Sequence, residues 1–584
     1  MLKTLAKSIR EFKGSSIATP ILVGFEVVME CIIPFVAASL IDNIQKGCEL
    51  SVILRYGAIL VGMACLSLLF GALAGVTCAK ASCGFAKNLR HDLFSHVQEF
   101  SFENIDRFSS SSLVTRLTTD VANVQMAYMM IIRVAVRSPL MLIFSLTMAF
   151  LMGGSMAVIF VAVIPLLGIG LFTVIRLTMP LFRRVFRKYD KLNESIEENI
   201  MGMRVVKSYV REEHEKKKFN DAAESVCLDF TKAEKILAFN GPLMQLCMYS
   251  VMIFAMYFGS KTIISAGTSD AFFGVGQLSA LLTYGAQILF SLMMLSMIFV
   301  MLTLAAESAE RIAQVLKEES TLKNPENPVC EVADGSVVFE NVSFRYSAKA
   351  TDAALSDINL SIASGETVGI LGGTGSSKST LIQLISRLYD VSEGRILVGG
   401  RDVREYDLDT LRGQVSVVLQ KNLLFSGTIK ENLRWGDPNA TDEQIVEACR
   451  LAQADEFISS FPDGYNTYIE QGGSNVSGGQ KQRLCIARAL LKKPKILILD
   501  DSTSAVDTKT DAMIRKAFRD YIPETTKIII AQRVSSVMDA DKIVIMDGGR
   551  IVAVGTHDEL LASSDIYREI YESQVKKGGD DDEE

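Results

Sequence analysis

The sequence predicts an α-helical domain with six transmembrane spans, followed by an α/β domain built around a P-loop. The first observation behind this prediction is the distribution of apolar residues. They make up 49% of the 584 residues, and almost all long apolar runs lie before about residue 305. The second observation is a glycine-rich loop between a strand pattern and a helix pattern in the remaining part, where charges occur throughout. The length alone suggests about three or four domain-sized units.

Six apolar stretches have the length of a membrane-spanning helix. About 20 apolar residues are needed to cross roughly 30 Å of hydrocarbon. Six such runs in succession are hard to explain as buried helices of a soluble protein. No cleavable signal peptide is evident, so we expect the first stretch to remain as a span. The predicted spans cover approximately residues 17–41, 52–79, 128–152, 155–179, 238–260 and 272–303.

The charges between the spans predict the orientation of the chain. Four cations lie between Lys3 and Lys13, before the first span, and the long connection 180–237 is rich in lysine and arginine. The links after the first, third and fifth spans are short and carry few cations. The positive-inside rule therefore places both termini and the two long connections, about 80–127 and 180–237, in the cytoplasm. Both connections favour helix, and we expect helices that continue from the spans.

Among the charged residues inside the predicted spans, two pairs have helical spacing. Glu26 and Glu30 are four residues apart, hence on one helix face, and Arg133 and Arg137 have the same spacing. Charges at this depth usually face a water-filled cavity or a partner. Two interpretations stay open: the residues pair with one another or lie near an interface, or they contact a substrate.

The glycine-rich stretch GILGGTGSSKSTLIQLI, residues 369–385, runs from a strand pattern into an amphipathic helix. The backbone amides of such a loop and of the helix N-terminus cradle phosphates. In this pattern Lys378 reaches the β- and γ-phosphates of a nucleotide, and Ser379 binds magnesium. The regular pattern has glycine where this chain has Ser377. The earlier glycines of the loop remain, so we expect the loop to form.

Further motifs follow in order along the second half. The stretch VVLQKNLLFSGTIKENL supplies Gln420, and NVSGGQKQRLCIARALL holds a Ser-Gly-Gly turn that opens a helix. KILILDD is a buried strand that delivers Asp500 as a magnesium-side carboxylate, and KIIIAQR ends another buried strand. The net charge of −7 gives no reason to expect binding to nucleic acid.

Together these motifs resemble the nucleotide-binding domain of an ATP-binding cassette (ABC) transporter, and the six spans resemble the membrane half of a type IV, drug-exporter-like half-transporter. The resemblance implies ATP and Mg²⁺ as cofactors, membrane lipids and a hydrophobic small molecule as partners, and a bacterial cytoplasmic membrane location with a cytoplasmic nucleotide-binding domain. It divides the chain into a transmembrane domain (1–315), a linker (316–335), a nucleotide-binding domain (336–575) and an acidic tail expected to be disordered (576–584).

The resemblance also implies roles for individual residues. Tyr346 would stack on adenine, and Gln420 would sense the γ-phosphate. Magnesium would be held by Ser379, Gln420 and Asp500. The phosphates would be bound by Gly372, Gly373, Thr374, Gly375, Ser376, Ser377, Lys378, Ser379 and Thr380.

Other segments would act between subunits. The signature that closes over a nucleotide held by the opposite subunit would be Ser477, Gly478, Gly479 and Gln480. Ser504 to Asp507 would cross the dimer interface. The segments near Ser110–Arg116 and Glu198–Tyr209 match the coupling helices of the family.

Two positions depart from the family pattern. Asp501 stands where the family has its catalytic glutamate, and Gln532 stands in the place of its switch histidine. A carboxylate withdrawn by about 1 Å can cost on the order of 100-fold in rate, and a neutral amide at 532 lacks the positive charge that stabilises the γ-phosphate. The four histidines lie elsewhere in the sequence, at His91, His96, His214 and His557.

The two departures beside an intact signature resemble the degenerate-site subunit of bacterial heterodimeric multidrug exporters. The predicted function is ATP-driven export of hydrophobic or amphipathic small molecules across the cytoplasmic membrane, with weak hydrolysis at the chain's own site. The partner would be a second half-transporter with a catalytic glutamate and an altered signature. Two alternatives remain: a homodimeric lipid or peptide exporter, and an ATP-gated channel or regulator.

Overall fold

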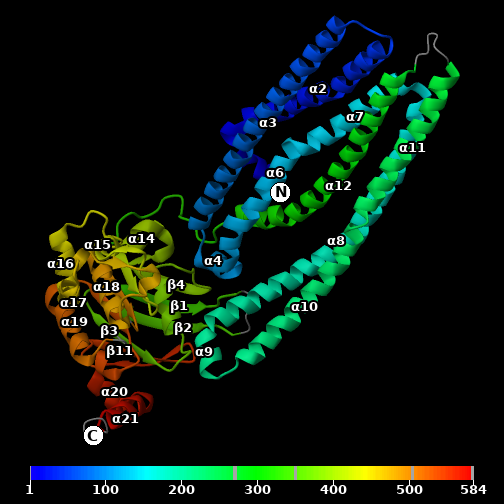
Figure 1. Cartoon of the computed structure of the whole chain (residues 1–584). Coiled ribbons are helices and arrows are strands. Elements are labelled where there is room, and N and C mark those ends of the chain that lie inside the picture. The colour runs from blue at the N-terminus through cyan, green and yellow to red at the C-terminus, as the bar shows by residue number, and fades with distance from the viewer. Residues whose placement is uncertain (1, 267–272, 348–351, 502–505, 580–584) are drawn as a thin grey trace. The chain divides into compact units, whose positions relative to one another are not determined.

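The computed structural model describes residues 2–266, 273–347, 352–501 and 506–579, which form two compact units (Figure 1). The first unit comprises Met1–Glu99 and Phe108–Glu318, and the second comprises Phe100–Arg107 and Glu319–Glu584. Each unit is described by itself below.

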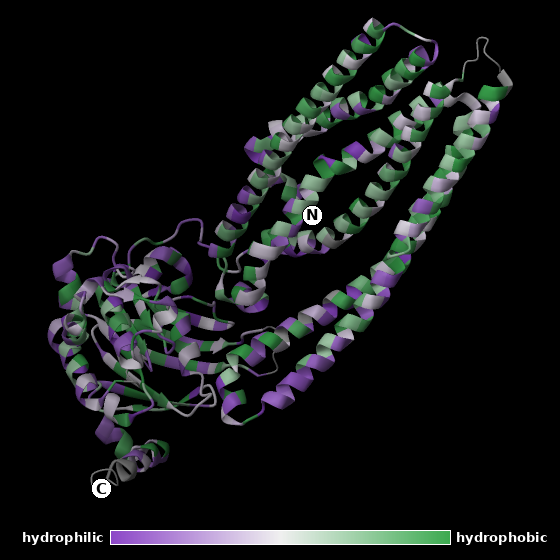
Figure 2. Ribbon diagram, in the orientation of Figure 1, coloured by the Kyte–Doolittle hydropathy of each residue, from purple (hydrophilic) through white to green (hydrophobic). Residues whose placement is uncertain are grey.

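The first unit is entirely helical among its described residues. Figure 2 shows hydrophobic residues along most of α2, α3, α7, α11 and α12, and hydrophilic residues along α10. The helices of this unit are α1 (Leu2–Ala6), η1 (Lys7–Phe12), α2 (Lys13–Gln45), α3 (Leu50–Gln98), α5 (Ser110–Thr115), η2 (Arg116–Asp120), α6 (Val121–Ile132), α7 (Val134–Gly153), η3 (Gly154–Ala157), α8 (Val158–Met201), α9 (Met203–Ser208), α10 (Glu212–Leu237), α11 (Asn240–Ala266) and α12 (Val275–Lys317).

Five continuous helical stretches are long and apolar enough to cross a membrane, within the described part of the chain. They contain five of the six predicted spans and the sixth from residue 275 onwards, and the stretch Ser110–Met201, which is 92 residues long, includes two of them. The two spans meet at Gly154, whose φ of 51° ends α7 and is a conformation that glycine adopts without a steric penalty. The predicted extensions of the spans are also present as continuous helix, since α3 has 49 residues and α8 has 44.

Helices α8 and α10 pack against each other along the second long connection. Val185, Leu192 and Val226 form a small buried cluster between them. Lys188 Nζ lies 2.6 Å from Asp229 Oδ2, and Asp229 is 5% exposed. A carboxylate buried to this degree is stable only with a partner of opposite charge, so this ion pair sets how the two helices align.

Charged residues of the first and third predicted spans form an ion-pair cluster between α2 and α7. Arg137 Nη1 donates to Glu26 Oε1 at 2.5 Å, and Arg137 Nη2 donates to both carboxylate oxygens of Glu30 at 2.8 Å. Arg133 makes no ion pair with the residues that the structure describes. Three of the four side chains therefore pair with one another, which agrees with the first of the two interpretations.

Helix α12 approaches α2 closely at its N-terminus. The Gly276 amide donates to Asp42 Oδ1 at 2.9 Å, which satisfies one of the unpaired amides of the first turn of α12. A Cβ atom at position 276 would collide with the carbonyl oxygen of Ala38. The glycine is therefore required for the two helices to meet here.

The second unit is an α/β domain with three sheets. A six-stranded sheet has the order β12-β11-β3-β10-β9-β6, a four-stranded sheet has the order β2-β1-β4-β5, and β7 pairs with β8. The strands are β1 (Val337–Phe344), β2 (Leu355–Ile362), β3 (Thr367–Gly372), β4 (Glu393–Val398), β5 (Arg401–Asp402), β6 (Val415–Val418), β7 (Gly427–Thr428), β8 (Tyr468–Ile469), β9 (Ile496–Asp500), β10 (Thr526–Ile530), β11 (Lys542–Asp547) and β12 (Arg550–Gly555).

Helices and short 3₁₀ turns surround these sheets. The buried hydrophobic side chains form two clusters, which include Leu499 and Ile529 in one and Ile370 and Ile498 in the other. The helical elements are α4 (Phe102–Phe108), α13 (Lys378–Ile385), η4 (Val403–Glu405), α14 (Leu408–Gln414), α15 (Ile429–Leu433), α16 (Asp442–Leu451), α17 (Asp455–Ser460), η5 (Gly464–Asn466), η6 (Gln471–Gly473), α18 (Gly478–Leu491), α19 (Thr508–Tyr521), η7 (Val534–Ser536), α20 (His557–Ser563) and α21 (Asp565–Gly579).

Five strands of the six-stranded sheet, from β11 to β6, run parallel. Strands β9 and β10 are buried at every residue, as expected for parallel strands covered on both faces. Strands β3, β10 and β9 are neighbours in that order, so their carboxyl ends meet at one edge of the sheet. This edge carries the loop of residues 373–377, the pair Asp500 and Asp501, and Gln532.

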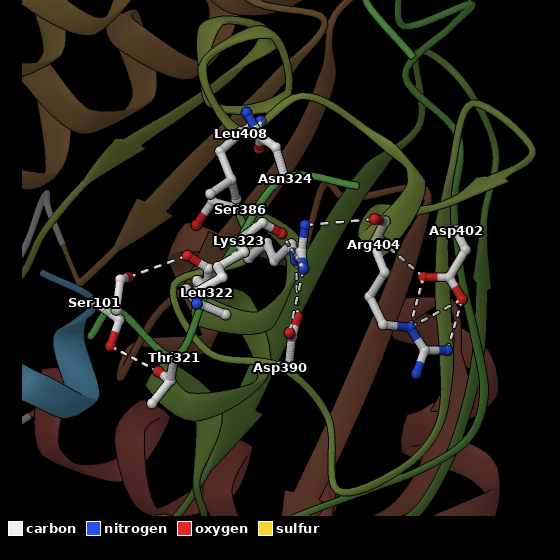
Figure 3. Close-up of polar contacts among 12 residues, drawn as sticks. Ser101, Thr321, Leu322, Lys323, Asn324, Ser386, Asp390, Asp402, Arg404 and Leu408 are labelled. Carbon is white, nitrogen blue, oxygen red and sulfur yellow. Dashed lines mark hydrogen bonds and ion pairs between the residues drawn. The ribbon is translucent and has the colours of Figure 1, made fainter. Parts of the chain in front are cut away.

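Two segments outside the α/β sequence region also belong to the second unit. Ser101, at the start of α4, has its Oγ 2.8 Å from Thr321 Oγ1, and the Leu408 amide donates to Asn324 Oδ1 at 3.0 Å (Figure 3). Tyr389 donates its hydroxyl proton to Asp106 Oδ2 at 2.7 Å. The sequence did not predict that Phe100–Arg107 would belong to the second unit.

Substitution of Gly276 by alanine should lower the melting temperature of the purified chain by several degrees. The added Cβ overpacks the contact between α12 and α2, and overpacking of this kind costs about 1–3 kcal/mol. Gly168→Ala is the matched control, because a Cβ at position 168 of α8 meets no atom within 4 Å. Thermal unfolding in detergent, followed by size-exclusion chromatography, measures both variants. Equal melting temperatures would contradict the close approach of α12 and α2.

Candidate functional site

A cavity of about 550 Å³ opens at the edge of the sheet where β3, β10 and β9 end. Its size is within the usual range for a small-molecule or cofactor site. Its lining combines polar and apolar groups, which come from the loop after β3, the start of α13 and the ends of the neighbouring strands. The lining residues are Leu371, Gly372, Gly373, Thr374, Gly375, Ser376, Ser377, Lys378, Ser379, Thr380, Gln420, Asp500, Asp501, Ile530, Ala531, Gln532 and Ile570.

The loop after β3 wraps around the ammonium group of Lys378. Lys378 Nζ donates to the carbonyl oxygens of Gly372 and Gly373, each at 2.8 Å. Gly372 has no room for a side chain, because a Cβ there would collide with the carbonyl oxygen of Met546. Burial lowers the pKa of Lys378, although the nearby Asp500 and Asp501 oppose this effect.

Ser377 precedes α13 in a left-handed backbone conformation, with φ of 67° and ψ of 24°. This explains why the regular pattern has glycine here: a Cβ in this region brings a steric cost that glycine avoids. The loop forms in spite of the serine, as the sequence predicted. The loop therefore carries local backbone strain at position 377.

Asp500 and Asp501 follow one another at the end of β9, and both residues are buried. Burial raises the pKa of Asp500, while a hydrogen bond with Ser379 and the charge of Lys378 act in the opposite direction. The described residues contain no group of three or more His, Cys, Asp or Glu side chains that could hold a metal ion. One carboxylate and one hydroxyl suit Mg²⁺ that also binds phosphate oxygens and water, rather than an all-protein metal site.

The carboxylate of Asp501 is held by two amide side chains. Gln532 Nε2 donates to Asp501 Oδ2 at 2.7 Å, and Gln420 Nε2 lies 3.4 Å from the same oxygen. Burial raises the pKa of Asp501, and the hydrogen bonds from the two glutamines lower it. The two positions that depart from the family pattern, 501 and 532, are therefore in direct contact.

The predicted signature residues lie at the start of α18 and are absent from the lining of the cavity. Ser477 Oγ accepts from the Gln480 amide at 3.3 Å, and Gln480 Oε1 accepts from the Ser477 amide at 2.9 Å. This reciprocal capping box orders the first turn of the helix. It leaves Gly478 and Gly479 in that turn without side chains to cover their amides.

Tyr346 lies beside the cavity rather than in its lining. Its hydroxyl is 2.9 Å from Thr380 Oγ1 in α13, and its ring contacts the rings of Phe344 and Tyr389. Its side chain is about half exposed, at 47%, so a flat surface remains available for stacking.

Other predicted residues are placed as follows. Asp507 caps α19 by accepting from the Thr510 amide at 2.9 Å, whereas Ser504 and Ala505 lie outside the described residues. Of the segments matched to coupling helices, the first forms α5, capped by Ser109, and the second contains α9. No histidine lines the cavity, in agreement with the sequence.

The C-terminal helix α21 contributes to the site, which the sequence did not predict. Ile570 lines the cavity, and Gln574 Nε2 donates to the backbone carbonyl of Gln532 at 2.8 Å. No sequence pattern marks a lone glutamine on an amphipathic helix, so its contact depends on how α21 folds back onto the loop after β10.

Comparison with known families agrees with this arrangement. Residues 17–293 match the ABC transporter transmembrane region, and residues 355–504 match the ABC transporter ATP-binding region, described as "ABC transporter". The two matches follow the division between the helical unit and the α/β unit.

Several curated proteins are similar over most of the chain. An uncharacterized ABC transporter ATP-binding protein, YfiB of Bacillus subtilis, is 37% identical over 559 residues, which cover 96% of each chain. The putative multidrug export ATP-binding/permease protein YgaD of B. subtilis is 33% identical and covers 83% of each chain. The ATP-dependent lipid A-core flippase of Desulfotalea psychrophila is 32% identical and covers 84% of each chain.

A solved structure has the same fold. A bacterial Atm1-family ABC exporter with ATP bound superimposes with a TM-score of 0.84 over 96% of this chain and 99% of that chain, at 24% sequence identity. At this identity the likeness concerns the fold alone.

We expect Ser377→Gly to stabilise the chain by up to about 1 kcal/mol, because glycine removes the steric cost of the left-handed conformation. Thermal unfolding without nucleotide measures this gain, and binding of a fluorescent ATP analogue measures its effect on affinity. Ser376→Gly is the matched control at the preceding position. Ser376 is outside the left-handed region and its Oγ donates to the Gly373 carbonyl at 2.8 Å, so that variant should be destabilised. The same response in both variants would contradict strain at position 377.

Proposed function

The chain belongs to the ABC transporter family, and on that premise we propose that it is one half of a heterodimeric exporter with a degenerate ATP site. It is an ATP-hydrolysing membrane transporter with a helical transmembrane region followed by an ABC ATPase domain. In the proposed assembly the chain's own site hydrolyses ATP slowly. Its signature motif completes a competent site on a second, different half-transporter.

The contact between Asp501 and Gln532 carries this proposal. A general base must come within about 3 Å of the proton that it takes, directly or through one water. Asp501 is one methylene shorter than glutamate, and its Oδ2 already accepts from Gln532 at 2.7 Å. Gln532 is neutral, so it does not supply the positive charge that would stabilise the γ-phosphate during transfer. Both changes lower turnover at the same carboxylate.

Binding of ATP does not require either of these groups. The amides of the loop and of the first turn of α13 would cradle the phosphates, and the ammonium group of Lys378 lies within that loop. Ser379 and Asp500 would hold Mg²⁺ together with the phosphates, with Gln420 nearby in the same cavity. When bound, Mg²⁺ neutralises charge on the phosphate oxygens. Slow hydrolysis with intact nucleotide binding is the expected result.

The signature supports a role for the chain in its partner's site. α18 has 14 residues, and its N-terminus carries the intact sequence Ser477 to Gln480. The free amides and the positive end of the helix dipole favour an anion there. Since these residues do not line the chain's own cavity, the anion would be the nucleotide of the opposite subunit.

The transported compound and the membrane belong to the same proposal. Hydrophobic or amphipathic small molecules are proposed as substrates, in keeping with the names of the relatives YgaD and lipid A-core flippase. The positive-inside rule favours cytoplasmic termini and a cytoplasmic nucleotide-binding domain in a bacterial cell membrane. Membrane lipids would surround the five apolar helical stretches.

A homodimeric lipid exporter is the second candidate. The 32% identity to a lipid A-core flippase over 84% of this chain favours it. In a homodimer Asp501 would be the carboxylate at both sites, since no other acidic residue among the described ones lines the cavity except Asp500. The two candidates therefore differ in how much transport depends on Asp501.

We expect the purified full-length chain, alone in lipid nanodiscs, to hydrolyse ATP slowly. The double variant Asp501→Glu/Gln532→His should raise turnover by about one to two orders of magnitude, because it restores both the reach of the base and the charge near the γ-phosphate. Phosphate release at saturating MgATP measures both proteins. Lys378→Ala is the control for background phosphatase activity. Brisk turnover by the unaltered self-paired chain would overturn the degenerate-site proposal.

Transport in cells separates the heterodimer from the homodimer. In a heterodimer, Asp501→Asn should leave export of a fluorescent amphipathic dye within about threefold of the unaltered protein, because the partner's site still turns over. In a homodimer it should abolish export. The assay compares dye efflux from cells that carry the chain in its native genetic setting. Lys378→Ala serves as the comparison for loss of nucleotide binding at this site.

A further inference from the structure

The side chain of Gln574 bridges two backbone groups on either side of Arg533. Gln574 Nε2 donates to the carbonyl of Gln532 at 2.8 Å, and Gln574 Oε1 accepts from the amide of Val534 at 2.8 Å. One amide group therefore satisfies an acceptor and a donor of the loop that follows β10. A planar group with two short hydrogen bonds restricts both the position and the rotation of the peptide segment between them.

The helix that carries Gln574 is itself anchored to the body of the second unit. Tyr567, in the first half of α21, is completely buried, and its hydroxyl lies 2.6 Å from His557 Nδ1 at the start of α20. Tyr571, one turn later, contacts the ring of His557, and Ile570 packs against the core and lines the cavity. These contacts leave α21 little freedom to slide or rotate, so Gln574 is presented to the loop from a fixed element.

The loop segment held by Gln574 contains the side chain that contacts Asp501. Gln532 Nε2 donates to Asp501 Oδ2 at 2.7 Å, and the Asp501 amide donates to the carbonyl of Ile530 at 2.9 Å. Asp501 is thus bonded twice to the chain at the end of β10. Its backbone amide bonds to Ile530, and its carboxylate bonds to the side chain of Gln532. Pairing with the sheet ends at Ala531, whose amide donates to the carbonyl of Ile370 at 3.3 Å, and Gln574 holds the backbone that follows.

We propose that Gln574 is a positioning residue for ATP hydrolysis, which acts by holding the backbone of Gln532 so that the Gln532 amide reaches the carboxylate of Asp501. Gln574 itself does not line the cavity. Helix α21 therefore acts on the reaction through the Gln574 amide group and the loop after β10. These contacts lie within a single α/β unit, so the role does not depend on how the subunits pair.

A purely structural role for Gln574 predicts a different result. If it only closed the loop against α21, its loss would lower stability and affect nucleotide binding and turnover alike. A positioning role predicts reduced turnover with unchanged affinity, because Lys378 and the phosphate loop are untouched. It also predicts that the effect disappears when Gln532 has no side-chain amide to place.

Three variants of the full-length chain in nanodiscs test the proposal. Gln574→Met keeps the length of the side chain and removes both hydrogen bonds. Gln574→Glu keeps an acceptor for the Val534 amide and loses the donor to the Gln532 carbonyl. Ser573→Ala is the matched control, since the Ser573 hydroxyl only bonds within α21, to the carbonyl of Ile570 at 2.8 Å. Melting temperatures establish that each variant is folded, and phosphate release over a range of MgATP concentrations gives kcat and KM.

The expected result is a loss of kcat of roughly three- to tenfold in both Gln574 variants, as for one or two hydrogen bonds of ordinary strength. KM for ATP should stay within about twofold, and Ser573→Ala should match the unaltered chain. In a Gln532→Ala background, Gln574→Met should cause no further loss. Unchanged or raised kcat in Gln574→Met, or the same fold-loss with and without the Gln532 side chain, would overturn the proposal.

Discussion

The parallel pairing of β3, β10 and β9 is the constraint on which the site depends. Ile530 pairs with both Ile370 and Asp500, so β10 and β9 end at the same level, and β3 continues two residues further, to Gly372. A shift of one residue would turn every side chain of a strand to the other face. Because β9 and β10 are buried along their whole length, hydrophobic burial resists such a shift. Hydrophobic burial of these strands thus fixes their register, and the register sets the position of Asp500 and Asp501 relative to the phosphate-binding loop.

The lining of the cavity is the part of the site that could be predicted from the sequence. A strand that runs into a glycine-rich loop, and a strand that ends in Asp500, each follow from local patterns of apolar and small residues. Parallel neighbours then bring the ends together. Gln574 could not be predicted in this way, because 42 residues separate it from Gln532 and nothing around it departs from an ordinary amphipathic helix. Contacts between side chain and backbone across such a separation depend on tertiary packing.

In the helical unit, too, local sequence patterns predicted some features, whereas others depend on tertiary packing. Apolar length predicted the spans, and the positive φ of Gly154 ends α7 between the two spans that lie in one helical stretch. Helical spacing placed Glu26 and Glu30 on one face. It could not decide between pairing and substrate contact, because Arg137 reaches both glutamates from another helix. The place of α4 in the second unit was also missed, since Asp106 and Tyr389, which contact each other there, are 283 residues apart.

Asp501 adopts a left-handed backbone conformation, with φ of 49°. Aside from glycine, asparagine and aspartate occupy this region most readily, because their short polar side chains can bond to the nearby backbone. A glutamate at the same position has more reach but lacks this advantage. The shorter acid therefore strains the main chain less at this position, and its carboxylate reaches less far into the cavity. A subunit released from selection for fast turnover can drift towards aspartate as a gain in stability, and the return to glutamate would have to overcome that gain.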